Sequence, residues 1–137
     1  MAGKKVLYET EAINQDGLNG KAFIENGLKI EVSNPRSDSP GTNPEQLLGL
    51  SLSTCMNATL QAIERKQGLE HTSEVRVKVT MVQGPTGLEF IVKARVHIPS
   101  VSLKIAESFV RLAERSCPVS KLLSGSKNYT IEAVEHF

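Results

Sequence analysis

Hydrophobic and polar positions alternate along the N-terminal third of the chain with a period of two, which is typical of strands. Residues 4–14 form the first such segment. Two more flank the pair Asn26-Gly27, which favours a two-residue type I′ turn. Residues 21–32 are therefore predicted to form a hairpin, and the N-terminal third is predicted to be a meander of three strands.

A long helix is predicted after this meander. Asn43, Pro44 and Gln46 are typical of a helix start, because they supply a cap, a first helical residue and a side chain that reaches back to the cap. Gly68 is typical of a helix end. The pattern turns polar only at Glu64 and the two basic residues after it.

The body of this helix is apolar on nearly every side, which is typical of a helix that is buried rather than half-exposed. We therefore expect a long central helix that runs through the core and carries one of the two cysteines near its middle. Its apolar positions are Leu47, Leu48, Leu50, Leu52, Cys55, Met56, Ala58, Leu60 and Ile63.

Two alternating segments, residues 73–83 and 88–98, follow the helix and flank a turn that contains Gly84 and Pro85. They are predicted to be antiparallel strands with one face in contact with water. An amphipathic helix over about residues 103–114 is expected next, capped by Ser100 or Ser102.

The C-terminal segment places the second cysteine, Cys117, directly before Pro118. Since proline suits the first position of a helix, Cys117 is predicted to cap a short helix that ends at Gly125. A last strand is expected over residues 128–135. The order of elements predicts one α+β domain over residues 1–137, with antiparallel sheets packed on helices.

Composition and charge narrow the expected partners, compartment and cysteine chemistry. The 137 residues carry 16 basic and 15 acidic side chains, a balance that does not favour nucleic acid or an anionic membrane as partner. The N-terminal segment lacks the apolar stretch of a secretory signal, so we expect a cytoplasmic protein. Structural disulfides are rare in that compartment, so the two cysteines indicate free thiols, metal or redox chemistry.

The cysteines occupy different predicted environments. Cys117 lies where helix N–H groups favour a thiolate, whereas Cys55 lies in an apolar helix and could simply pack as a small hydrophobic residue. A metal site is not predicted, because the chain has no CxxC motif and its three histidines follow no ligand spacing.

Two blocks of sequence together resemble the OsmC/Ohr family of hydroperoxide reductases. The first is TNPEQL with Cys55 ten residues after Glu45, and the second is CPVS, which begins at Cys117 about sixty residues later. The resemblance implies an OsmC-like fold and an intertwined homodimer with two sites at its interface. It implies that Cys55 is the peroxidatic thiol and that Cys117 is the resolving thiol.

The resemblance also implies how Cys55 is activated. A thiol in an apolar helix needs a cation beside it to ionise, and in the family an Arg held by a Glu supplies that cation. Glu45 matches the family's Glu. Ten residues of helix rise about 15 Å, so we infer that Glu45 acts across a dimer interface or through the arginine. An acid in the first turn of a helix is also favoured by the helix dipole alone.

The arginine distinguishes two branches of the family. Where Ohr-type members carry it after the first strand, this chain has Leu18. OsmC-type members carry an Arg in the loop before the central helix, where this chain has Arg36. The sequence is therefore closer to the OsmC branch, with Arg36 as the candidate activator; a solvated loop arginine is the alternative reading.

The predicted function is a peroxidase that reduces organic hydroperoxides without a bound cofactor. The residues expected to form an apolar substrate site are Leu48, Leu52, Met56 and Phe109. An external dithiol or a lipoylated protein is expected to reduce the enzyme. Two alternatives remain open: a non-catalytic protein that binds an apolar ligand at the dimer interface or senses redox state, and a structural protein in which Cys55 only packs.

Overall fold

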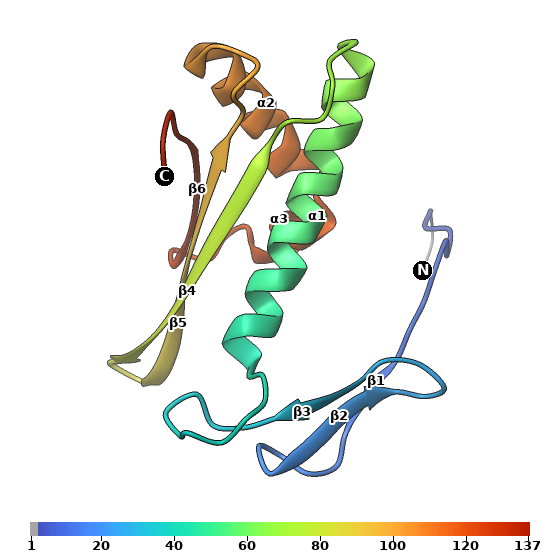
Figure 1. Ribbon diagram of the computed structural model, residues 1–137, viewed down its shortest axis with the longest axis vertical. Coiled ribbons are helices and arrows are strands. Elements are labelled where there is room, and N and C mark those ends of the chain that lie inside the picture. Colours follow the sequence, from blue (N-terminus) through green and yellow to red (C-terminus); the bar gives the residue numbers. More distant parts are fainter. Residues whose placement is uncertain (1–2) are drawn as a thin grey trace. The chain divides into compact units, whose positions relative to one another are not determined.

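The computed structural model describes residues 3–137, which divide into two compact units, residues 3–44 and 45–137. Each unit is described by itself (Figure 1). The order of elements, βββ-α-ββ-α-α-β, is the predicted one. The elements are β1 (Ala12–Asn14), β2 (Gly20–Ile24), β3 (Lys29–Val32), α1 (Pro44–Lys66), β4 (Glu74–Gly84), β5 (Gly87–His97), α2 (Leu103–Ser116), α3 (Pro118–Leu123) and β6 (Tyr129–Ala133).

The N-terminal unit contains an antiparallel sheet in the order β1-β2-β3. The prediction of a strand over residues 4–14 was wrong in its length, because β1 begins at Ala12. Only three residues of β1 pair with β2. Upstream of Ala12, Val6 and Tyr8 are 69% and 82% exposed, since this segment has neither a partner strand nor a packed face within the unit.

The hairpin between β2 and β3 is confirmed, but its turn is not the predicted type I′. A type I′ turn needs positive φ at both central residues. Here Asn26 has a φ of 58°, whereas Gly27 does not have positive φ. The Gly27 N–H donates to the Ile24 carbonyl at 2.8 Å, so Glu25 and Asn26 are the central residues of the turn. The Ile24 N–H donates to the Leu28 carbonyl at 2.7 Å, so the loop that joins the strands extends from Glu25 to Gly27.

The central helix α1 is continuous and starts at Pro44, as predicted. Its end is fixed by Gly68, which has a φ of 71°. The Gly68 N–H donates to the Arg65 carbonyl, and the Leu69 N–H donates to the Glu64 carbonyl. These two bonds form a Schellman motif, which requires a left-handed residue after the helix and therefore favours glycine.

The prediction that α1 is buried on all sides is wrong for the single chain. One face is buried, through Leu52, Met56, Leu60, Ile63 and Glu64. The opposite face leaves Leu50 62% exposed and Leu47 36% exposed. A single three-stranded sheet covers one side of a helix, so the remaining apolar side chains have no cover within the unit.

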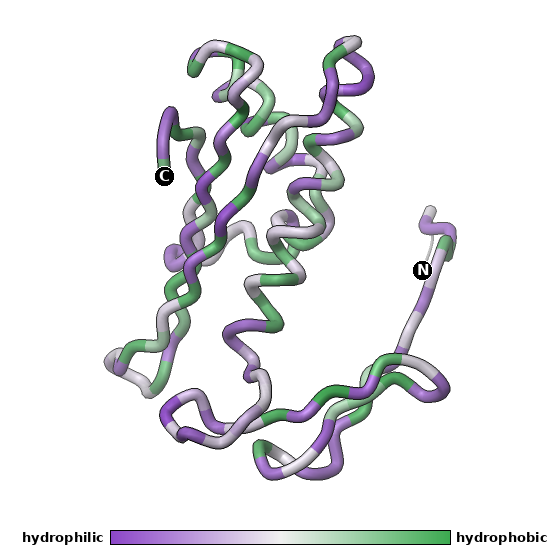
Figure 2. Tube along the Cα trace, in the orientation of Figure 1, coloured by the Kyte–Doolittle hydropathy of each residue, from purple (hydrophilic) through white to green (hydrophobic). Residues whose placement is uncertain are grey.

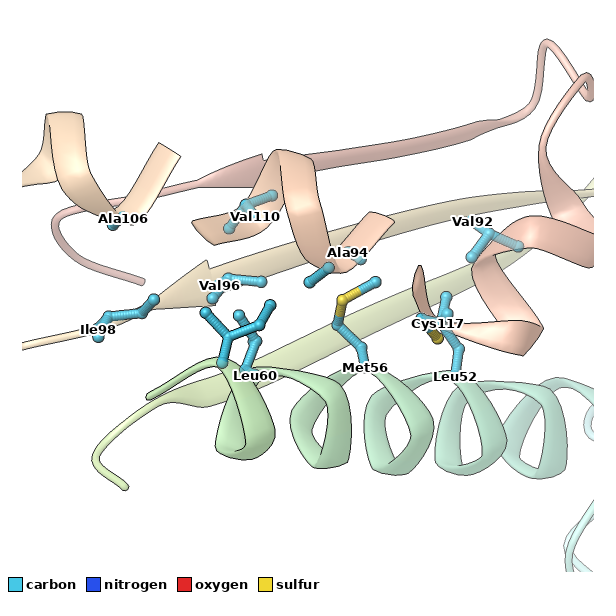
Figure 3. Close-up of a cluster of buried hydrophobic side chains, with 12 residues drawn as sticks. Leu52, Met56, Leu60, Val92, Ala94, Val96, Ile98, Ala106, Val110 and Cys117 are labelled. Atoms are coloured by element: carbon cyan, nitrogen blue, oxygen red, sulfur yellow. The ribbon is translucent and has the colours of Figure 1, made fainter. Parts of the chain in front are cut away.

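The C-terminal unit places α1 on a sheet in the order β4-β5-β6 (Figure 1). Polar and apolar residues alternate along β4 and β5 (Figure 2), so the sheet has one packed and one exposed face. Figure 3 shows Leu52, Met56 and Leu60 pointing from α1 toward the sheet, where they belong to the same buried cluster as Ala94 and Val96.

This sheet is mixed rather than purely antiparallel, which corrects the prediction. β4 and β5 are antiparallel, but β6 pairs with β5 in parallel. The chain leaves β5, passes through α2 and α3 and returns as β6, and such a crossover through helices joins parallel strands.

Ser102 caps α2 by accepting a hydrogen bond from the Ile105 N–H at 3.3 Å, as predicted. Across residues 3–137, no helix has the length and apolar character needed to cross a membrane.

Candidate active site

Cys55 lies in the middle of α1, beside the buried face of the helix. Its side chain is half-buried and packs against the core cluster that includes Leu52 and Met56. The helix is regular here, and the Thr59 hydroxyl donates to the Cys55 carbonyl at 2.9 Å. The backbone of Cys55 is therefore held in a regular helix, while the residue is partly exposed to solvent.

Cys117 lies at the junction of two helices and is fully buried. Its N–H donates to the Ala113 carbonyl at 2.8 Å and so ends α2. Its sulfur accepts the Ser120 N–H at 3.4 Å and so caps α3, with Pro118 at the first helical position. The predicted capping role of Cys117 is confirmed.

The two sulfurs meet although the residues are 62 positions apart in the chain. Cys117 Sγ donates a hydrogen bond to Cys55 Sγ at 3.1 Å, and both cysteines are free thiols. A disulfide has an S–S bond of about 2.05 Å. The sulfurs therefore need to approach by only about 1 Å to form one.

Burial raises the pKa of the Cys117 thiol above its ordinary value of 9.0. The hydrogen bond to Cys55 and the negative charge of an ionised Cys55 raise this pKa further, while the N–H groups of Ser120 and Val119 lower it. Cys117 therefore holds its proton at neutral pH and acts as the donor in the S–H···S bond.

Ser120 and Tyr129 form a second contact next to the thiols that the sequence did not predict. Their hydroxyls are 2.7 Å apart, and Ser120 is fully buried. Burial raises the pKa of the Tyr129 phenol above its ordinary value of 10.0. A signal was present, because Tyr129 lies in the strand expected over residues 128–135 and a buried tyrosine hydroxyl usually has a partner.

Glu64 was also missed, because it was assigned to the polar end of α1. It is fully buried, and its Oε2 accepts the Thr72 N–H at 3.0 Å and lies 3.2 Å from His71 Nδ1. The other oxygen, Oε1, has no hydrogen-bond partner among the described residues. Its position four residues after Leu60, on the buried stripe, was the available signal.

The two residues predicted to activate Cys55 lie in different units. Glu45 is half-buried in the first turn of α1 and lines an open hollow of about 430 Å³. Because α1 is unbroken, Glu45 and Cys55 are about 15 Å apart along the helix axis. Arg36 is exposed in the N-terminal unit, where its N–H donates to Asn34 Oδ1 at 2.9 Å.

The four residues predicted to line an apolar substrate site differ in their exposure to solvent. Leu52 and Met56 are fully buried core residues. Leu48 and Phe109 are half-buried and pack against that core. The hollow beside Glu45 lies along α1 and β4, and its lining consists of Glu45, Gln46, Gly49, Leu50, Ser53, Val75, Val77 and Val79.

Within residues 3–137, no three His, Cys, Asp or Glu side chains are grouped as ligands for a metal ion. Comparison with known protein families identifies the family of the chain. A sequence model of the family described as OsmC-like protein matches residues 36–132, a segment that contains Arg36, Glu45 and both cysteines. The chain belongs to the OsmC-like family. The resemblance inferred from the two sequence blocks is thereby confirmed.

Individual OsmC-like proteins support the same assignment of fold. The chain is 31% identical to organic hydroperoxide resistance protein OhrA of Bacillus subtilis over 79% of this chain and 82% of the relative. A crystal structure from Lactobacillus casei ATCC 334, described as a candidate redox protein, is 51% identical, with a TM-score of 0.93 over 98% of this chain and 96% of that one.

A second crystal structure is described as an organic hydroperoxide resistance protein OsmC of Legionella pneumophila. It is 27% identical, with a TM-score of 0.84 over 94% of this chain and 97% of that chain. The predicted OsmC-like α+β fold with a central helix is therefore confirmed.

Proposed function

We propose that this protein is a thiol peroxidase that reduces organic hydroperoxides to alcohols. The observation that carries the proposal is the thiol pair: Cys117 Sγ donates to Cys55 Sγ at 3.1 Å, and Cys55 is the more exposed of the two. Relatives named organic hydroperoxide resistance proteins support the choice of substrate class.

The reaction has two chemical steps. The Cys55 thiolate attacks the terminal peroxide oxygen; the O–O bond breaks and Cys55 becomes a sulfenic acid. The alkoxide takes up the proton that Cys55 lost on ionising and leaves as the alcohol. The Cys117 sulfur then attacks the Cys55 sulfur; an S–S bond forms, the S–O bond breaks, and water leaves. The two thiols lose two electrons to the hydroperoxide, and an external dithiol or a lipoylated protein returns them.

The unequal burial of the thiols suits these roles. A hydroperoxide needs access to the first sulfur, and Cys55 is the less buried of the two cysteines. The resolving thiol needs to be protected from a second peroxide and held close to the first, and Cys117 is fully buried at 3.1 Å. The half-buried Leu48 and Phe109 are proposed to contact the alkyl group, with Leu52 and Met56 supporting them from the core.

By the resemblance, Arg36 supplies the cation that lowers the pKa of Cys55 in the active protein, and Glu45 orients it. The resemblance also implies a homodimer. The exposed Leu47 and Leu50 support this part of the proposal, because an apolar helix face without cover is typical of an interface between subunits.

The test is to mix reduced protein with one equivalent of cumene hydroperoxide and to count free thiols. We expect rapid loss of both thiols, a Cys55–Cys117 peptide link by mass spectrometry, and a slower reaction with hydrogen peroxide. Cys55→Ser is expected to abolish the reaction, and Arg36→Ala to slow the first step. Survival of both thiols on prolonged exposure would refute the proposal and favour a protein that binds an apolar ligand.

A further inference from the structure

We propose that the Ser120–Tyr129 hydroxyl pair positions Cys117 for disulfide formation with Cys55. This inference adds two positioning residues to the proposed function and rests on it for its kinetic part. The two hydroxyls are 2.7 Å apart in a part-buried contact. Neither residue touches the peroxide in the proposed reaction, so both act through the sulfur of Cys117.

The reason lies in the short helix that carries Cys117. α3 has six residues, too few to be stable by its own backbone hydrogen bonds. Val119 and Leu123 of α3 pack on the core, and Ser120 bonds Tyr129. Packing of apolar side chains has little directional preference, whereas a hydrogen bond is directional, so the hydroxyl pair is expected to help fix how α3 is rotated.

Tyr129, the partner of Ser120 in the hydroxyl contact, belongs to the sheet. Tyr129 is the first residue of β6, and it pairs with Val92 of the central strand β5. The inner face of this sheet packs against α1, which carries Cys55. Tyr129 therefore links α3 to the same framework that holds the other sulfur.

Ser120 completes the path to the reacting atom. Its side chain bonds Tyr129, and its own N–H donates to Cys117 Sγ at 3.4 Å. The path from sheet to sulfur consists of these two bonds, and the path ends 3.1 Å from Cys55 Sγ. Since reaction rates fall steeply when reacting atoms are misplaced by about 1 Å, loss of the hydroxyl pair is expected to slow the step that forms the disulfide.

The variants that test this are Tyr129→Phe and Ser120→Ala, which remove one hydroxyl each and keep the packing. The matched control is Ser124→Ala directly after the same helix, because the exposed Ser124 hydroxyl bonds the local Lys121 carbonyl and, among residues 3–137, no more distant group. Circular dichroism and thermal unfolding check that each variant folds.

The first measurement uses cumene hydroperoxide in a stopped-flow experiment, with dimedone to trap sulfenic acid. We expect the first phase, release of the alcohol, to be unchanged in both variants. Formation of the disulfide is expected to slow about five- to tenfold, the worth of one buried hydrogen bond, and a dimedone adduct on Cys55 is expected to accumulate. Equal slowing of both phases, or no slowing of the second, would overturn the inference.

The second measurement does not depend on peroxidase activity. Each protein is equilibrated with reduced and oxidised glutathione, and the ratio of Cys55–Cys117 disulfide to dithiol is measured. We expect the equilibrium constant for disulfide formation to fall about five- to tenfold in both variants and not in Ser124→Ala. A wild-type protein inert to cumene hydroperoxide would refute the proposed function, whereas an unchanged glutathione equilibrium in the variants would refute this inference.

Discussion

Because the Cys117 sulfur is buried, the free energy of unfolding is expected to depend on pH in the alkaline range. Because the folded state holds the Cys117 proton more tightly than the unfolded chain, the unfolded chain ionises first once the pH exceeds 9.0. Stabilisation from this group is therefore complete below pH 9.0 and is lost as the pH rises toward the pKa of the folded state. Tyr129 acts in the same direction above pH 10.0.

We predict that Cys117→Ser makes this alkaline loss of stability shallower. Urea unfolding of the reduced protein at several pH values above 8 provides the measurement. Cys55→Ser is the control, since it leaves the buried Cys117 thiol in place and should keep most of the alkaline loss. Parallel curves for wild type and Cys117→Ser would contradict the prediction.

The buried Glu64 carboxylate gives a second prediction at the residue scale. Glu64→Ala removes the acceptor of the part-buried hydrogen bond from the Thr72 N–H and leaves a cavity at the end of α1. We expect the free energy of unfolding to fall by about 2–3 kcal/mol. Glu70→Ala, at an exposed position nearby, should change it by less than about 0.5 kcal/mol. Chemical denaturation compares the two, and equal effects would show that Glu64 has no special role.

At the scale of elements, the left-handed residue after α1 controls where the helix ends. An added Cβ at Gly68 meets no atom within 4 Å, so the cost of Gly68→Ala comes from the backbone alone. We expect a loss of about 1 kcal/mol in the free energy of unfolding. Gly68→Asn should lose less, because asparagine tolerates positive φ. Thermal unfolding measures both, and an Ala variant as stable as wild type would contradict the assignment.

The elements themselves were largely predictable, because their signals are local. Asn26-Gly27, Pro44, Gly68 and Ser102 each mark a boundary through their own backbone or capping chemistry. The pairing of β6 was not predictable, because the direction in which a strand returns depends on the whole crossover. The extent of β1 was not predictable either, since alternation continues in the sequence beyond the point where the partner strand ends.

For the candidate site too, features with a local signal were predictable and features that depend on packing were not. The sequence indicated both cysteines and the cap at Cys117, which follow from motifs. The 3.1 Å distance between the sulfurs depends on how α1 packs against the junction of α2 and α3, and no local pattern encodes it. Glu64 was assigned to the polar end of the helix because charged residues are rarely fully buried. Its position on the buried face of α1 indicated the opposite.

At the scale of the whole molecule, the exposed apolar face of α1 predicts self-association. The proposed homodimer would sediment at twice the chain mass of 14.9 kDa. We expect Leu50→Glu to shift the protein to monomer, because it places a charge on that face. Leu88→Glu is the control, since Leu88 is equally exposed at the β4–β5 turn. Analytical ultracentrifugation distinguishes these outcomes, and a dimeric Leu50→Glu variant would place the interface elsewhere.

The meeting of two sulfurs 62 positions apart also bears on how the protein is destroyed. A bond between them closes a ring that contains the β4–β5 hairpin, all of α2 and about half of α1. When the oxidised chain unfolds it remains a closed loop, and this restriction lowers the conformational entropy of the unfolded state. The oxidised protein would therefore unfold less readily, and would be less open to proteases that cut the unfolded chain, until a dithiol opened the ring.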